Sequence, residues 1–239
     1  MRPTSRRIFL NTDQVVKRLV CYFGYRHRTL EAALLLLVVA IGFAVRMSDL
    51  DAQPFWVDEA ESSINALTIL QKGYPSDVYL GLPIYENTLV RRWPENPEYE
   101  FRDVSYSDKH FAIYHGWLPL YAIAGSFALY RIQPDNADGS LRVKHDLSER
   151  KRRTRAARLP SAIFGSIFLL IAFVGGIVFY GRDAAWAALI VGSIYPWHVD
   201  LSRQARYYSL QVALTTVCCV VLWLLLTRCR WKHVIRRLA

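Results

Sequence analysis

The sequence predicts an all-α fold, a polytopic transmembrane helical bundle with interfacial helices in a long first external loop. Two observations predict it. Hydrophobic residues make up 53% of the 239 residues and come in long blocks, of which 159–180 and 207–227 contain no charge. A helix of about 20 apolar residues crosses a bilayer. The basic residues cluster at block ends and in one loop, which favours a membrane protein over a nucleic-acid-binding protein despite the net charge of +10.

Four spans are expected, at about residues 30–48, 158–180, 184–198 and 207–227, with an external loop over 49–157. The first is interpreted as a signal anchor, and the third is predicted because it lies between two others. The basic terminal segments, residues 1–29 and 229–239, are expected in the cytoplasm. If residues 115–131 also crossed, there would be five spans. Long loops cross the membrane largely regardless of their charge, so the basic residues of the loop are weak evidence of its location. The basic tail is the better evidence, and it favours four spans.

The external loop is expected to carry two helices, over residues 58–70 and 114–132. The first is followed by the stop signal Lys72-Gly73-Tyr74-Pro75. Residues 75–109 are predicted to be a loop, and residues 142–158 a basic stretch. No cysteine lies in this external loop, so no disulfide framework is indicated, and no zinc-ligand spacing is present; the four are Cys21, Cys218, Cys219 and Cys229.

A carboxylate pair, Asp58 and Glu59, follows the first span closely. One interpretation is structural, because Asp58-x-x-Glu61 has the spacing of a capping box at a helix start. The other is catalytic, because an ionised aspartate beside a bound hydroxyl can act as a general base. The two interpretations are compatible, since the amino end of a helix also favours a carboxylate.

Two further positions have both a structural and a functional interpretation. His115 lies on an apolar segment, where a lone histidine is more often structural than a ligand. Arg158 opens the predicted second span, with Pro160 in its first turn. Such an arginine can simply extend to the membrane surface, or it can bind a lipid phosphate, for which its guanidinium geometry is well suited.

The segment 195–208 concentrates polar residues at the predicted boundary of two spans. An ordinary loop with interfacial aromatic residues would account for part of it. Four charged or titratable residues within nine positions favour a head-group or substrate site instead: His198, Asp200, Arg203 and Arg206.

The order of these motifs carries more information than any one of them. Trp-x-Asp-Glu at residues 56–59 is followed by His-x-x-x-Pro-Leu-Tyr at 115–121 and Arg-Leu-Pro-Ser at 158–161. Pro-x-His-x-x-x-Ser-x-x-x-Arg-Tyr at 196–207 completes the series. Over residues 30–228 this order resembles the amino-terminal half of the GT-C membrane glycosyltransferases. The resemblance is to the bacterial branch related to protein O-mannosyltransferases, aminoarabinose transferases and Rgt-type transferases. The chain departs from it at Gly116 and Trp117, where members usually have His-Pro-Pro-Leu, and in a longer basic insert over residues 144–155.

The resemblance implies a glycosyltransferase that moves a sugar from a polyprenyl-phosphate carrier to an acceptor on the non-cytoplasmic face, with inversion at the anomeric carbon. It implies that Asp58 is the general base, supported by Glu59. Arg158 and Arg206 would bind the leaving phosphate, with His115 nearby, and His198 and Tyr207 would complete the substrate-binding residues. It also implies that the region of His115 forms a helix lying on the membrane, which agrees with four spans.

Family members have more spans than the four predicted here, so we expect a truncated gene product or a second chain that completes the module. The alternative is a non-catalytic membrane protein or subunit, a remnant that at most binds polyprenyl phosphate. The expected partners are the sugar donor and the lipid bilayer, with no nucleic acid, and the expected location is the bacterial inner membrane. No cofactor is indicated by the residues, and a divalent metal is left open.

Overall fold

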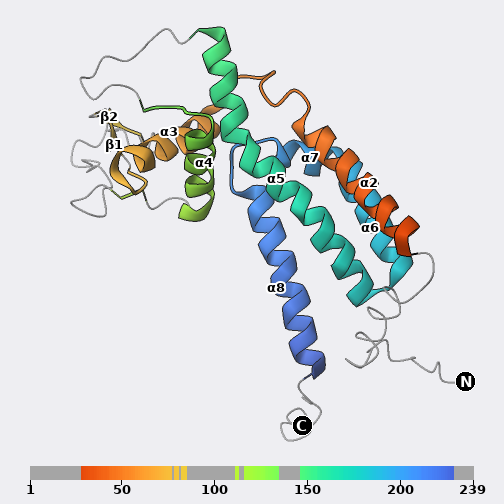
Figure 1. Ribbon diagram of the computed structural model, residues 1–239. Helices are drawn as coiled ribbons and strands as arrows, with labels where there is room; N and C mark the ends of the chain where they lie inside the picture. Colours follow the sequence, from red (N-terminus) through yellow and green to blue (C-terminus); the bar gives the residue numbers. More distant parts are fainter. Residues whose placement is uncertain are drawn as a thin grey trace, which may run out of the picture. The chain divides into compact units, whose positions relative to one another are not determined.

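The computed structural model describes residues 28–76, 78–80, 82–84, 111–112, 116–134 and 146–228. Over these residues the fold is almost wholly helical, which confirms the predicted helical class (Figure 1). The helices are α2 (Arg28–Met47), α3 (Val57–Lys72), α4 (Trp117–Leu129), α5 (Leu147–Phe179), α6 (Arg182–Ile194), α7 (Pro196–Ser202) and α8 (Tyr208–Arg228). The strands β1 (Val78–Tyr79) and β2 (Leu82–Pro83) form a short antiparallel pair.

Three of the described helices are long and apolar enough to cross a membrane: α2 over Thr29–Met47, α5, and α8 over Tyr208–Leu226. The bounds of α2 and α8 lie close to the predicted spans 30–48 and 207–227. Helix α5 begins at Leu147, eleven residues before the predicted start at 158. The basic stretch is helical because Glu149 pairs with Arg152 and Arg153 one turn further along, contacts that stabilise an exposed helical turn.

The predicted span 184–198 is not one continuous helix. Helix α6 has 13 residues and ends at Ile194; Tyr195 is extended, as expected before a proline, and α7 starts at Pro196. A 13-residue helix is about 20 Å long, shorter than the apolar core of a bilayer. Crossing by residues 184–198 therefore stays a prediction. The predicted cytoplasmic ends, apart from the start of α2, lie outside the described residues.

The chain divides into two compact units. Among the described residues, the first unit comprises 28–45, 165–199 and 211–228, and the second comprises those between 46 and 164 together with 200–210. The core of the first unit is formed by Leu169, Phe173, Ile177, Ala185 and Leu189. Helices α5 and α6 approach closely there, because a Cβ added to Gly176 would lie 2.5 Å from the Ala185 Cα.

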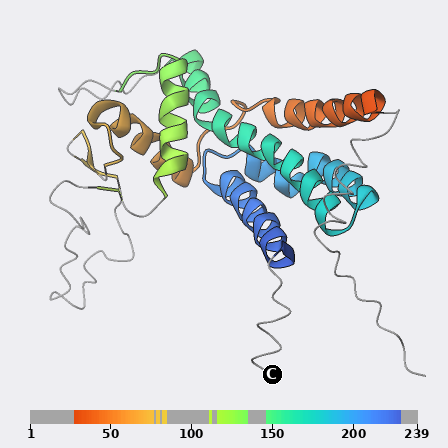
Figure 2. The same ribbon diagram turned by 60° about the horizontal axis from the view of Figure 1, so that its bottom comes forward.

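The second unit packs α3 against α4, which lie side by side in both ribbon views (Figures 1 and 2). Its core includes Leu67, Leu120, Ile123 and Phe127. Helix α3 ends at the predicted stop signal, where Gly73 adopts φ 81° and its N–H donates to the Ile69 carbonyl. The Tyr121 hydroxyl of α4 donates to the Gly73 carbonyl at 2.8 Å, so α4 fixes the end of α3.

Pro160 lies inside α5 rather than in its first turn, which corrects the sequence prediction. A proline has no N–H, so the Ala156 carbonyl, four residues earlier, lacks its usual helical donor. The Ser126 hydroxyl of α4 supplies that donor at 2.6 Å, in a buried contact.

We expect Ser126→Ala to lower the free energy of unfolding by about 1–3 kcal/mol, the cost of leaving a buried carbonyl unsatisfied. Chemical unfolding in detergent micelles measures this. The matched control is Ser193→Ala: the Ser193 hydroxyl is equally buried and donates to the Leu189 carbonyl at 2.7 Å, but it is an additional donor in an unbroken helical turn. An equal loss in both variants would show that Ser126 does not compensate for the proline.

The second unit also constrains the membrane topology. Both α5 and α8 begin in it and leave it toward their carboxyl ends. If both helices cross the bilayer and the rest of the second unit lies on one side of it, they cross in the same direction, and residues 180–207 must return the chain. In a cysteine-free background, we expect Gln53→Cys and Asp200→Cys to be labelled from one side by an impermeant thiol reagent, and Thr29→Cys and Tyr180→Cys from the other. All four positions are exposed. Labelling of Tyr180→Cys and Asp200→Cys from the same side would contradict the return crossing.

Candidate functional site

The guanidinium of Arg158 holds the connector between α2 and α3. Its Nε and Nη2 donate to the two carboxylate oxygens of Glu59 at 2.8 and 2.7 Å. Nη1 donates to the carbonyls of Leu50 and Gln53 at 2.7 and 3.0 Å, and Nη2 also donates to that of Pro54 at 3.2 Å. A guanidinium has five N–H donors, and all five are used here.

Arg158 therefore differs from its predicted setting at a span start. It is the twelfth residue of α5, 7% exposed, and paired with a glutamate that is 1% exposed. An arginine that extends to the membrane surface would not be buried in this way. A phosphate could bind Arg158 only by displacing these acceptors, so the described arrangement makes it part of the internal framework of the unit.

Glu59 joins three parts of the chain. Besides the Arg158 pair, its Oε1 accepts the Ala205 N–H at 2.8 Å. Glu59 thus connects α3, α5 and the segment before α8. A carboxylate this buried is stable only when paired and fully hydrogen-bonded, and both conditions are met.

The guanidinium of Arg206 contacts the first turns of α3. Its Nη2 lies 3.2 Å from the Asp58 Oδ2, and its Nη1 is 3.2 Å from the Glu61 Oε2. Nη1 also donates to the Asp58 carbonyl and the Ser62 hydroxyl at 3.0 and 3.2 Å. The Arg206 side chain is 6% exposed and that of Asp58 is 36% exposed, so the carboxylate is the accessible member of the pair.

The predicted capping box is wrong. The N-cap of α3 is Trp56, without a side-chain cap hydrogen bond, and Asp58 is the second helical residue. Its carboxylate instead lies against Arg206, and its place in the first turn adds the favourable field of the helix amino end. Trp56 and Val57, just before it, are 49% and 82% exposed, so Asp58 follows two exposed apolar residues in the chain.

Sequence reasoning missed several residues of this cluster. The sequence indicates Glu61 only as part of a cap, and it does not indicate Ser62 or the Ala205 N–H. Arg203, which the sequence assigns to a head-group or substrate site, donates to the carbonyls of Ser48 and Asp49 just after the end of α2. The signal for Glu61 was present, because residues three apart lie on one face of a helix.

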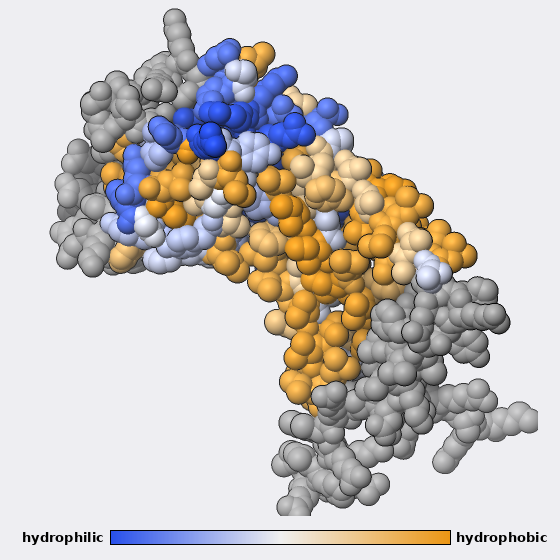
Figure 3. Space-filling view, viewed as in Figure 1, coloured by the Kyte–Doolittle hydropathy of each residue, from blue (hydrophilic) through white to orange (hydrophobic). Residues whose placement is uncertain are grey.

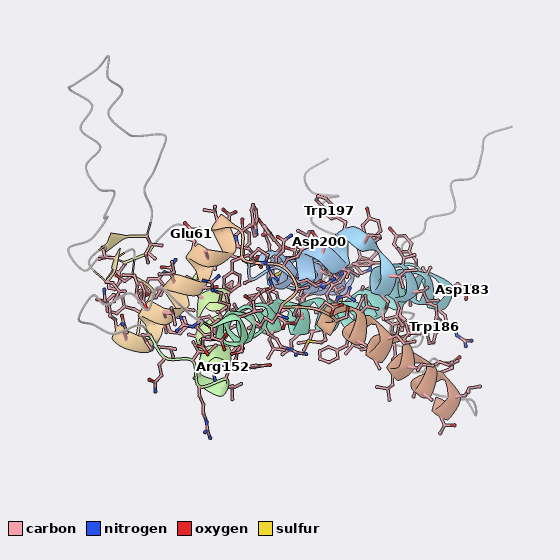
Figure 4. All side chains as sticks on the ribbon, turned by 90° about the horizontal axis from the view of Figure 1, so that it is seen from above. Glu61, Arg152, Asp183, Trp186, Trp197 and Asp200 are labelled. Carbon is pink, nitrogen blue, oxygen red and sulfur yellow. The ribbon has the colours of Figure 1, made fainter. Side chains whose placement is uncertain are left out.

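The remaining predicted residues lie in different settings. His115 is outside the described residues. His198, in α7, belongs to the first unit, where its ring packs 4.6 Å from that of Phe168. Tyr207 is half-buried, with its ring 5.5 Å from the Arg206 guanidinium and 4.8 Å from the Tyr208 ring. In Figure 4, Glu61 projects from α3, while Trp197 and Asp200 project from α7.

Within the described ranges, no three His, Cys, Asp or Glu side chains are close enough to share a metal ion. Comparison with protein-family models, curated proteins and solved structures finds no match. Function is therefore inferred from the order of the motifs and from the cluster formed by Asp58, Glu59, Glu61, Arg158 and Arg206.

Proposed function

We propose that this chain is a membrane glycosyltransferase, or the part of one, that transfers a sugar from a polyprenyl-phosphate carrier to an acceptor hydroxyl on the non-cytoplasmic face. One observation carries the proposal: a partly exposed carboxylate, Asp58, lies 3.2 Å from the buried guanidinium of Arg206. The same unit contains the end of α2 and the start of α8, two candidate spans. A base and a cation in the same unit as the ends of two candidate membrane helices are suited to a reaction between a polar acceptor and a lipid-borne donor.

The proposed reaction assigns one step to each group. Asp58 accepts the proton of the acceptor hydroxyl, whose oxygen forms a bond to the anomeric carbon of the sugar. The bond between that carbon and the carrier phosphate oxygen breaks, and the oxygen keeps the electron pair. The phosphate gains negative charge as it leaves, and a fixed cation such as Arg206 stabilises that charge. Attack opposite the leaving group inverts the anomeric carbon.

The Glu59–Arg158 pair has a supporting role in this proposal. Through Glu59 it ties the first turn of α3 to the Ala205 N–H, next to Arg206. It thereby fixes the distance between base and cation. A catalytic pair must be held within a fraction of an ångström, and buried supporting hydrogen bonds achieve this.

The proposal is tested by a transfer assay in membranes of the source cells, with a panel of radiolabelled polyprenyl-phosphate sugars. We expect one donor to give a labelled product that disappears when the gene is deleted and returns when it is restored. Native mass spectrometry of the purified chain adds a binding readout, with polyprenyl phosphate compared with polyprenol. No transfer with any donor, and equal retention of the two lipids, would reject the proposal.

Arg206→Lys is expected to weaken polyprenyl phosphate binding by about 1–3 kcal/mol, the range for a hydrogen bond to a charged group. Lysine keeps the charge but loses the planar fork that matches a phosphate. The binding titration measures the change. Asp58→Asn is the comparison variant, because it removes a carboxylate that competes for Arg206 and therefore should not weaken binding of the donor phosphate. Equal affinity of wild type and Arg206→Lys would make Arg206 a structural residue only.

A second candidate, a non-catalytic membrane protein or subunit that at most binds polyprenyl phosphate, is favoured by one observation. The donors of Arg158 are all used, and the side chain of Arg206 is 6% exposed, as in an internal clamp. Retention of polyprenyl phosphate without transfer in the source membranes would support this candidate over the enzyme.

A further inference from the structure

The first turns of α5 carry an exposed group of basic residues, here called the basic collar: Arg150, Lys151, Arg152 and Arg155. Residues 146–155 contain five basic against two acidic side chains, a net charge of +3. Successive helical residues point about 100° apart, so Arg150, Lys151 and Arg152 face three different directions. The charge therefore spreads over about 200° of the helix circumference and is not confined to one face.

The two acidic residues of this stretch leave most of the collar charge uncompensated. Glu149 forms ion pairs with Arg152 and Arg153, at 2.6 and 3.1 Å. Asp146 accepts the Ser148 hydroxyl at 2.7 Å, a hydrogen bond that lowers the pKa of its carboxyl, and it caps the start of the helix by accepting the Arg150 N–H on its carbonyl. Among the residues that the structure describes, no carboxylate forms an ion pair with Arg150, Lys151 or Arg155.

The same helix continues without a break into an apolar stretch. Beyond Leu159, α5 exposes an apolar stripe at helical spacing: Ile163, Ile167, Leu170 and Val174, each 39–44% exposed. Such a stripe on a helix long enough to cross a membrane is suited to lipid chains. Figure 3 shows hydrophilic residues around the first turns of α5 and hydrophobic residues along the rest of it.

If α5 crosses the bilayer with Leu159 at the edge of the apolar core, helix geometry places the collar at the depth of the lipid head groups. With a rise of about 1.5 Å per residue, Arg155 lies about 6 Å and Lys151 about 12 Å before Leu159. The head-group layer on each side of the apolar core is about 5–8 Å thick, and the long side chains of arginine and lysine extend along the helix to reach it.

We propose that the basic collar binds the phosphate groups of anionic phospholipids around the amino-terminal end of α5. The continuity of the collar with the apolar stripe selects this partner over a soluble polyanion, because insertion of α5 fixes the collar in the plane where lipid phosphates lie. Attraction of basic residues beside a membrane helix to anionic lipid is expected on general electrostatic grounds. The proposal requires only that α5 crosses the bilayer, so it stands or falls independently of glycosyl transfer.

The test is electron spin resonance on the full chain reconstituted in lipid vesicles, with spin-labelled phosphatidylglycerol compared with spin-labelled phosphatidylcholine. We expect the wild type to prefer phosphatidylglycerol, with a preference that weakens as salt is added. In R150Q/K151Q/R155Q the preference should fall by about fivefold or more, the equivalent of one effective basic contact. These side chains are exposed, so the midpoint of chemical unfolding should not change.

Two variants serve as controls. R150K/K151R/R155K keeps every charge and should keep the preference. Arg131→Gln removes an exposed basic residue after α4 and should leave it unchanged. If the triple variant fails to reconstitute, K151Q and R155Q are compared singly, with the same expected direction. An unchanged preference in the neutralised variants, or wild-type binding of an oligonucleotide in place of any lipid preference, would overturn the proposal.

Discussion

Glu59→Ala is expected to lower the free energy of unfolding by about 3–5 kcal/mol, the cost of removing one partner of a buried ion pair. The substitution leaves the Arg158 guanidinium buried without a counter-charge, and it leaves the Ala205 N–H without its acceptor. Of its hydrogen bonds, the Arg158 guanidinium would then keep only those with the carbonyls of Leu50, Gln53 and Pro54. Chemical unfolding in detergent micelles, followed by far-ultraviolet circular dichroism, gives the difference.

Three comparison variants show the cause of that loss. Glu59→Gln keeps the shape and the acceptor for Ala205 but removes the charge, so its loss should be smaller than that of Glu59→Ala. Glu61→Gln, two residues further along α3, removes a carboxylate that is 17% exposed and should cost much less. Replacing both partners, as Glu59→Met with Arg158→Met, should recover part of the stability, because no buried charge remains. If Glu59→Ala and Glu61→Gln were equally destabilising, burial of the Glu59–Arg158 pair would not be the cause.

Asp58→Asn is expected to reduce sugar transfer by about 10²–10⁴-fold, the usual contribution of a general base. Asparagine has nearly the same shape and can still accept from Arg206, but it cannot take the proton of an acceptor hydroxyl. Stability should change little, because the Asp58 side chain is 36% exposed and a partly exposed ion pair contributes about 0–1 kcal/mol. The assay is run in source membranes in which the variant replaces the native gene, so that any partner chain remains present.

Glu61→Gln is again the matched control, because Glu61 also contacts Arg206 and lies one turn away on the same helix. Its transfer rate should stay within a small factor of the wild-type rate. A similar fall in both variants would mean that the two carboxylates act only by holding Arg206. Normal transfer by Asp58→Asn would remove Asp58 from the mechanism.

Much of the helical framework could be predicted from local sequence. The apolar blocks predict the positions of α2 and α8 to within two residues, because the length of an apolar helix is set by the chain itself. Helix α3 ends at Gly73 as expected, since only glycine adopts a positive φ at low cost. The start of α5 was missed because the i to i+4 pairing of Glu149 with Arg153 outweighs the loop-like composition of the basic stretch.

Local sequence indicates Asp58, Glu59, Arg158 and Arg206 as candidate site residues, from their place beside apolar blocks and from the order of their motifs. How these four side chains pair depends on the tertiary fold. Glu59 lies 99 residues from Arg158, and Arg206 lies 145 residues from Glu61. Adjacent carboxylates on a helix point about 100° apart, so α3 can pair Glu59 with the buried Arg158 of α5 while Asp58 lies toward the surface. Local sequence contains no information on how α3 is rotated about its axis, and it is the rotation that separates the buried structural carboxylate from the accessible one.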